Sequence, residues 1–290
     1  MTRISLVIPT RDRPGPLAAC LDSLVHSFPE DAETIVVSDG GERPEIERWV
    51  EPLRLRLIDA PHGGPAAARN RGLAAASGEV VAFTDDDCVP RPGWLAELAA
   101  HVSPGAAAAG TTVNGAAGAY ADASQTILEL VGRHADEAFF SGANVAFPAT
   151  ALRALGGFDE SFRTAEDREL CRRWRAAGLE LRRAEGAVVE HRPEIDLAGF
   201  LGRFYAYGRG ARRFHAAPEA SWGERSATLR FHLGLPFALA PYVRERGLVG
   251  GTRLLGLVGL WELANVAGFV AASGRRLRRT APAVEAVEQG

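Results

Sequence analysis

Three consecutive carboxylates are the clearest chemical feature of the sequence: Asp85, Asp86 and Asp87 follow the apolar run of residues 80–83. Adjacent carboxylates repel one another unless a cation lies among them. In an open α/β sheet, ligands bind at the carboxyl ends of the strands, and these aspartates would lie there if the apolar run is a strand. The cluster therefore predicts a site for a cation with an anionic ligand. The alternative is an acidic turn in water.

Two further charged residues follow the same pattern of strand and loop. Asp39 ends the β-branched run 34–38, and Arg69 lies in the alanine-rich stretch after Gly63 and Gly64. A carboxylate at a strand end can hold a ribose hydroxyl or a base N–H, and an arginine there can reach an anion. The ordinary alternatives stay open, because Asp-Gly pairs form turns and many alanine-rich helices contain an arginine.

A second acidic pair and a histidine complete the candidates. Glu166 and Asp167 come directly before a predicted helix over 168–177, and His191 ends a predicted strand over 187–191. Acids in a first helical turn are ordinary partners of the helix dipole, and a lone histidine is usually structural. Beside carboxylates, however, an imidazole at a strand end is a candidate metal ligand.

The elements that would position these residues alternate between strand and helix. Apolar runs over 4–8, 34–38, 53–58 and 80–83 are separated by helical patterns that begin near residues 14, 45 and 65. This alternation predicts a mostly parallel sheet flanked by helices. Residues 103–125 are rich in glycine and alanine with little periodicity, which predicts loop and a short strand.

Composition narrows the classes of function. The 290-residue chain has a net charge of −3, which argues against a general nucleic-acid binder. It contains no lysine, so a lysine-containing phosphate loop is absent. Its three cysteines show neither zinc spacing nor a disulfide framework, which suits a reducing cytosol. The first apolar run is too short for a signal peptide, so we expect a cytoplasmic protein.

The last hundred residues form a different kind of surface. Residues 191–290 carry 14 arginines against 8 acids, and a predicted helix over 200–214 interleaves arginines with aromatics. That helix fits a lid over an acceptor, or a patch facing phospholipid or a phosphate-bearing acceptor. Residues 254–272 are mostly apolar but contain Glu262 and Asn265. A buried or dimer-interface helix, an interfacial membrane helix and a membrane span remain alternatives.

Taken together, the motifs and their order resemble the family 2 glycosyltransferases, which have the GT-A fold. The resemblance covers roughly residues 3–192 and rests on VIPTR (7–11), SDG (38–40), GPAAARNRG (64–72), FTDDD (83–87), PGWL (92–95), GAN (142–144), GGFDE (156–160) and ED (166–167). It implies an α/β, Rossmann-like catalytic domain over 1–192 and a mainly helical C-terminal extension over 193–280. The remaining residues, 281–290, are expected to be a disordered tail.

The resemblance also implies roles for individual residues. The implied nucleotide-pocket residues are Pro9, Thr10, Arg11, Asp39 and Arg69, with Asp85 toward the ribose and Asp86 as the variable middle acid. The implied metal ligands are Asp87, Asp85 and His191. The implied acceptor-site residues are Gly142, Asn144 and Glu166, and the implied general base is Asp167.

The expected function follows from these roles: inverting, metal-dependent transfer of a sugar from a UDP-, GDP- or dTDP-sugar to a hydroxyl. A leaving diphosphate calls for Mn²⁺ or Mg²⁺, and the attacking hydroxyl calls for a base. Expected acceptors are a sugar, a lipid-linked or a small molecule, in polysaccharide, glycolipid or natural-product glycosylation. Nucleic acid is not an expected partner, while a membrane surface or a homodimer is left open. The alternatives are a sugar-nucleotide nucleotidyltransferase and a non-catalytic nucleotide-binding, membrane-associated protein.

Overall fold

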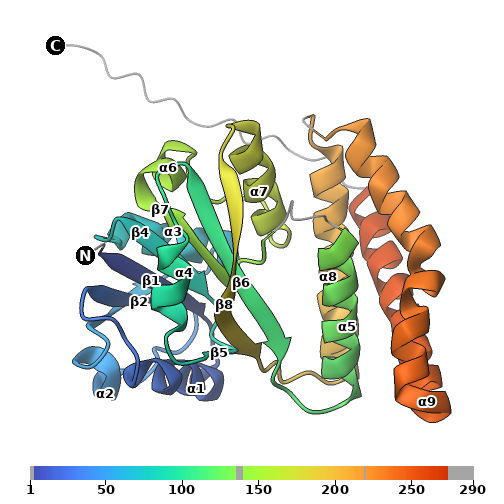
Figure 1. Cartoon of the computed structure of the whole chain (residues 1–290), viewed down its shortest axis with the longest axis horizontal. Helices are drawn as coiled ribbons and strands as arrows, with labels where there is room; N and C mark the ends of the chain where they lie inside the picture. Colours follow the sequence, from blue (N-terminus) through green and yellow to red (C-terminus); the bar gives the residue numbers. More distant parts are fainter. Residues whose placement is uncertain (1–2, 135–139, 219, 274–290) are drawn as a thin grey trace.

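The computed structural model describes residues 3–134, 140–218 and 220–273. The tail predicted over 281–290 and the end of the predicted extension lie outside these ranges. In the described part, a curved central sheet has helices on both faces, and a separate group of long helices stands beside it (Figure 1). The strands are β1 (Ile4–Thr10), β2 (Ala32–Asp39), β3 (Leu55–Ala60), β4 (Val80–Thr84), β5 (Cys88–Pro90), β6 (Ala106–Asn114), β7 (Asn144–Pro148) and β8 (Glu180–His191). The helices are α1 (Pro14–Val25), α2 (Glu47–Val50), α3 (Pro65–Ala75), α4 (Trp94–Ala100), α5 (Ala119–His134), α6 (Ala149–Ala154), α7 (Glu166–Ala176), α8 (Leu197–Ala216) and α9 (Trp222–Ser273).

The sheet has the order β3-β2-β1-β4-β7-β6-β8-β5. Its first four strands are parallel to one another, as the alternation of strands and helices predicts. Strand β7 runs antiparallel to both β4 and β6, and β5 runs antiparallel to β8, so the sheet as a whole is mixed. The chain leaves β1 toward β2 and later returns to β4 on its other side. That reversal creates a crevice at the carboxyl ends of β1 and β4.

Apolar side chains on both faces of the sheet explain why its strands read as continuous hydrophobic runs. In β1, Leu6 and Ile8 pack with α1 and α4, while Val7 packs with α3, α6 and α7. A third buried cluster joins α5, α8 and α9 away from the sheet, and it includes Phe200, Phe204 and Trp261. The helical C-terminal part therefore has an apolar core of its own.

The prediction of loop and short strand over 103–125 is right for the strand but misses the start of a helix. Strand β6 fills Ala106–Asn114, and α5 begins at Ala119. The first residues of β6 are buried alanines, whose small side chains give no strand signal although they pack tightly. The apolar spacing of α5 becomes visible only from Ala123 onward, with Ile127 and Leu130, so most of the pattern lies beyond the predicted segment; all three residues are buried.

Helix α9 is a hairpin of two antiparallel arms that meet at Gly247, whose φ of 67° and ψ of −174° break the helix. The arms lie against each other, as the distance of 2.7 Å between His232 Nδ1 and a carboxylate oxygen of Glu262 shows. The charge of Glu262 is thus paired between the arms. By length and composition, with a mean hydropathy of 1.7 in its most apolar window, α9 could cross a membrane; 28% of that window is buried.

Candidate active site

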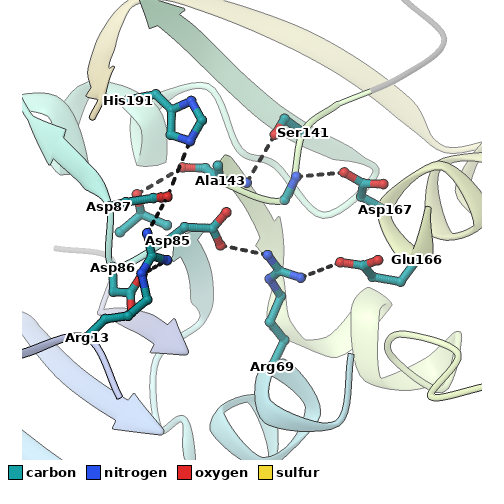
Figure 2. A network of polar contacts seen from close by, with 12 residues as sticks. Arg13, Arg69, Asp85, Asp86, Asp87, Ser141, Ala143, Glu166, Asp167 and His191 are labelled. Carbon is teal, nitrogen blue, oxygen red and sulfur yellow. Dashed lines mark hydrogen bonds and ion pairs between the residues drawn. The ribbon is translucent and has the colours of Figure 1, made fainter. Parts of the chain in front are cut away.

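The crevice between β1 and β4 brings two chain segments together. Thr10 ends β1 and donates its hydroxyl hydrogen to Asp86 Oδ2 at 2.7 Å. The guanidinium of Arg13, three residues later, donates to Asp86 Oδ1 at 2.6 Å and to Asp87 Oδ2 at 2.8 Å (Figure 2). Arg13 therefore contacts two of the three adjacent carboxylates and offsets part of their negative charge. Sequence reasoning did not single it out, although the arginines of this loop were the available signal.

Asp87 also faces His191, as the sequence analysis expected. Strands β5 and β8 pair Cys88 with His191, and this places His191 Nε2 3.4 Å from Asp87 Oδ2 (Figure 2). Burial alone would raise the pKa of the Asp87 carboxyl, but His191 and Arg13 hold it below its ordinary value. Asp87 is thus a buried, ionised carboxylate with an imidazole beside it.

Arg69 links the aspartate cluster to the second acidic pair. Its side chain is 5% exposed, and its two terminal nitrogens donate to Asp85 and to Glu166, each at 2.7 Å (Figure 2). Burial alone would lower the pKa of Arg69, but the two carboxylates raise it, so the guanidinium stays charged. One buried cation therefore ties the end of β4 to the start of α7.

The surroundings of Arg69 fix its orientation. Its guanidinium lies 5.6 Å from the ring centroid of Phe158. A Cβ at Gly142 would come within 3.1 Å of the guanidinium, so a larger residue at 142 would have to push the arginine aside. The Nε of Arg69 is buried and has no hydrogen-bond partner within the described residues. Gly142 is therefore needed as a close neighbour of Arg69.

Asp167 lies next to Glu166 at the start of α7, on a strained turn. Ala165, which precedes the helix, has a φ of 66° and a ψ of 19°, a left-handed conformation that costs a non-glycine residue about 1 kcal/mol or more. The backbone N–H of Gly142 donates to Asp167 Oδ2 at 3.2 Å. Burial and the charge of Glu166 raise the pKa of Asp167 to about 7. Near neutral pH this carboxyl can either accept or hold a proton, which is the property of a general base.

Asp39 is held firmly at the end of β2. Its two oxygens accept the backbone N–H groups of Gly63 at 2.7 Å and Gly64 at 2.8 Å, and His62 Nδ1 lies 2.9 Å away. Burial would raise the pKa of Asp39, but these hydrogen bonds lower it. Arg11, from the loop after β1, contacts His62. The structure thus adds His62 to the predicted pocket residues.

Asn144 has its side-chain amide fully engaged with the protein. Its oxygen accepts from Trp94 Nε1 at 2.8 Å, and its nitrogen donates to the backbone oxygens of Thr111 and Ala187. The residue is 2% exposed. This arrangement holds the loop before β7 in place, so any contribution of Asn144 to acceptor binding would act through the position of that loop.

All predicted site residues line one cavity of about 750 Å³. They are Pro9, Thr10, Arg11, Asp39, Arg69, Asp85, Asp86, Asp87, Gly142, Asn144, Glu166, Asp167 and His191. The cavity continues beyond them to side chains from α5, α8 and α9. Tyr207 comes from α8, whose sequence predicted a lid over an acceptor, whereas the contributions of α5 and of Trp261 in α9 were not expected.

The side chains available as metal ligands fit a hard divalent cation that takes most of its ligands from water and substrate. No group of three or more His, Cys, Asp or Glu in the described part of the chain is placed to hold a metal. However, Asp87 and His191 offer one carboxylate oxygen and one imidazole nitrogen on the same side of the cavity. Mg²⁺ and similar ions commonly keep several waters and bind substrate phosphates with one or two protein ligands. Two protein ligands are therefore sufficient for such a site.

Comparison with known proteins identifies the family. The model of glycosyl transferase family 2 matches residues 5–154, and that of glycosyl transferase family group 2 matches residues 80–271. A pre-mycofactocin glycosyltransferase from Mycobacterium tuberculosis is 32% identical over 292 residues. That match covers 95% of this chain but only 57% of the relative's length. The O-antigen biosynthesis protein RfbC of Myxococcus xanthus is 36% identical over 104 residues, which cover 33% of this chain and 8% of that protein.

Solved structures share the fold at low sequence identity. The mannosyltransferase PcManGT from Pyrobaculum calidifontis, in complex with GDP-Man and Mn²⁺, matches with a TM-score of 0.66 and 19% identity, over 94% of this chain and 86% of its own. S. aureus TarS 1–349, in complex with UDP-GlcNAc, matches with a TM-score of 0.55 and 18% identity, over 93% and 83%. The expected GT-A fold is thereby confirmed.

Proposed function

The chain belongs to glycosyltransferase family 2, and from this premise we propose that it transfers a sugar from a nucleoside-diphosphate sugar to an acceptor hydroxyl with inversion at the anomeric carbon. The observation that carries the proposal is the buried link through Arg69. It joins a carboxylate of the nucleotide side, Asp85, to the acidic pair at the start of α7, where Asp167 has a pKa near 7. The residues proposed for the donor and for the base thus line one cavity.

On the donor side, we assign the nucleoside to the pocket around Asp39, with Pro9, Thr10 and Arg11 as its other walls. All four residues line the cavity, and the Asp39 carboxylate is ionised and fixed by backbone N–H groups. A fixed acceptor of hydrogen bonds suits a ribose hydroxyl or a base N–H. UDP-, GDP- and dTDP-sugars are the donor class. PcManGT was solved with GDP-Man and TarS with UDP-GlcNAc, which supports this class without choosing among its bases.

Asp87 and His191 would hold Mn²⁺ or Mg²⁺, with Asp85, two positions before Asp87, as the third candidate ligand. When bound, such a cation neutralises the charge that develops on the leaving diphosphate. Arg13 supplies positive charge to Asp86 and Asp87 from the protein itself. PcManGT contains Mn²⁺, which supports the choice of cation class.

On the acceptor side, Asp167 takes the proton of the attacking hydroxyl. The acceptor oxygen forms its bond to the anomeric carbon from one face while the bond to the diphosphate oxygen breaks on the other. A single displacement inverts the configuration and needs no enzyme nucleophile. Gly142 donates its backbone N–H to Asp167 and so orients the base. Glu166 holds Arg69 and, by its charge, keeps the pKa of Asp167 high.

For location, we propose a cytoplasmic protein that binds peripherally to the inner face of the cell membrane through α9. The first arm exposes Trp222, Leu233 and Phe237 at 81%, 70% and 84%. The second arm exposes Leu263 and Val270 at 70% and 62%. An exposed apolar surface of this kind marks a membrane or protein contact.

In this proposal residues 193–280 form an extension that covers the acceptor and faces the membrane, in line with acceptors of polysaccharide or glycolipid synthesis. Sedimentation with anionic vesicles supports it, whereas a soluble homodimer that buries α9 contradicts it.

Thermal unfolding with nucleotides tests the donor assignment. We expect UDP, GDP or dTDP and the corresponding sugar nucleotide to raise the unfolding midpoint, and more so with Mn²⁺ than with EDTA. Asp39→Asn should reduce the shift. Asp59→Asn, at an exposed carboxylate of β3 outside the cavity, is the matched control. No stabilisation by any of the three nucleotides, with or without metal, would refute the donor class.

A further inference from the structure

The cavity extends past the proposed base into the helical layer, and this end is chemically unlike the nucleotide end. Its walls come from α5, α8 and α9: Leu128 and Tyr207 are partly exposed, and behind them lie the buried side chains of Ile127, Phe204 and Trp261. An aliphatic and aromatic lining favours an apolar ligand, whereas a pocket for a free sugar needs a polar group for most hydroxyls. The lining thus points to the acceptor's chemistry.

The aromatic part of this wall is rigid. Gly208 of α8 lies against the backbone oxygen of Asn265, where a Cβ would overlap that oxygen. Gly268 of α9 lies in the same way against the backbone oxygen of Tyr205. Close backbone packing at both points fixes the two helices relative to each other. The apolar wall is therefore formed before any ligand arrives.

The three rings are arranged around Phe204. Its ring centroid lies 5.6 Å from that of Tyr207 and 6.1 Å from that of Trp261, both edge to face. Tyr207 is 39% exposed and lines the cavity. Tyr207 therefore offers accessible side-chain surface to the cavity.

Arg203 gives this end of the cavity a positive charge. It lies one turn before Tyr207 on α8 and lines the cavity, and within the described residues it forms no ion pair and no hydrogen bond. Arg183 and Arg168 also line the cavity; each faces an aromatic ring and neither has a carboxylate partner in the described part of the chain. Glu129 at the rim is already bound by Gln125 and Tyr242. A half-buried guanidinium without a counter-ion favours an anionic ligand.

We propose that the acceptor is an amphiphilic anion: an apolar, ring-bearing body that packs on Tyr207, with a carboxylate or phosphate that binds Arg203. This inference rests on the proposed function, because it names the acceptor class for the same cavity. It excludes a free neutral sugar as the preferred acceptor.

Calorimetric binding of four small probes tests the proposal: 1-naphthylacetate, 1-naphthyl phosphate, the neutral 1-naphthylacetamide and methyl α-glucoside. The nucleotide end is first saturated with Mn²⁺ and the nucleoside diphosphate that stabilises the protein most, so that the probes report on the helical end. We expect both anions to bind about tenfold or more tightly than the amide, because a charged hydrogen-bond pair is lost with the amide. The relative affinity of the carboxylate and phosphate probes distinguishes the two anion types.

Arg203→Gln should remove the preference for the anions and leave the binding of the amide unchanged. Arg209→Gln, at an exposed arginine of the same helix outside the cavity, should keep it. Tyr207→Ala should weaken the binding of all three naphthyl probes. Equal binding of amide and acetate to the unmodified protein, tighter binding of the glucoside, or a preference that survives Arg203→Gln would each overturn the proposal. If no nucleoside diphosphate stabilises the protein, the donor assignment fails while the acceptor proposal stands, and the probes are then measured without nucleotide.

Discussion

Replacing Arg69 with methionine probes the link between the two halves of the site. The substitution keeps an unbranched apolar stem and removes the guanidinium, so Glu166 and Asp85 both lose their cation. Removal of one partner from a buried ion pair costs about 3–5 kcal/mol, because the remaining charge is left without compensation. The side chains of Arg69 and Glu166 are 5% and 9% exposed, so this range applies to their contact.

The contact with Asp85 contributes less. The Asp85 side chain is 33% exposed and water can solvate it, so its share is closer to the ~1 kcal/mol of a surface pair. We therefore expect Arg69→Met to lower the free energy of unfolding by about 3–5 kcal/mol, mostly through Glu166. The double variant Arg69→Met/Glu166→Gln should be more stable than Arg69→Met alone, since residue 166 is then no longer a buried charge without a partner.

Urea unfolding at pH 8, followed by circular dichroism, measures these differences. Arg182→Met is the matched control. Arg182 and Glu180 also form an ion pair, at 2.8 Å, but their side chains are 45% and 66% exposed, and we expect a change of less than about 1 kcal/mol. If Arg69→Met is no more destabilising than this control, or if Glu166→Gln fails to compensate it, the argument for a buried charge link is wrong.

Two further predictions concern the base and the helical layer. If Asp167 must be ionised to accept a proton, kcat/KM should rise with pH through a midpoint near 7. Glu166→Gln should move that midpoint to lower pH, because it removes a negative charge that raises the pKa of Asp167. A midpoint that Glu166→Gln does not move would contradict this cause. In α8, Gly208→Ala should destabilise the protein by about 1–3 kcal/mol in urea unfolding, because its Cβ would meet the backbone of Asn265. Gly202→Ala, in the same helix with nothing within 4 Å, should be neutral or stabilising by up to about 1 kcal/mol, and equal effects of the two would contradict the close packing.

The sequence predicts the parts of the site that depend on local order along the chain. Asp39 and residues 85–87 follow apolar strands directly, and parallel strands bring their carboxyl ends to one edge, so their meeting could be expected. Arg69 could be expected near an anion, but its contact with Glu166 spans 97 residues. Nothing in the spacing of the sequence indicates such a pairing.

Other features depend on tertiary packing that residue types do not reveal. Arg13 reaches two aspartates more than 70 positions away, and only the adjacency of β1 and β4 makes this visible. The hairpin of α9 depends on one glycine, Gly247, in a segment that contains several. Its pairing of His232 with Glu262 explains how an acid fits in the apolar stretch 254–272. The aromatic wall around Phe204 is likewise assembled from helices far apart in the sequence.

The rate of sugar transfer by the Asp167→Asn variant is the most direct test of the central claim. That claim is that the nucleotide-binding carboxylates and a separate base act in one cavity. Nucleoside diphosphate release with acceptor present reports turnover, and calorimetry reports donor affinity in the same buffer with Mn²⁺. We predict that donor affinity changes less than about twofold while turnover falls at least about 100-fold, the usual contribution of a general base. Turnover near that of the unmodified protein, with donor binding intact, would contradict the claim.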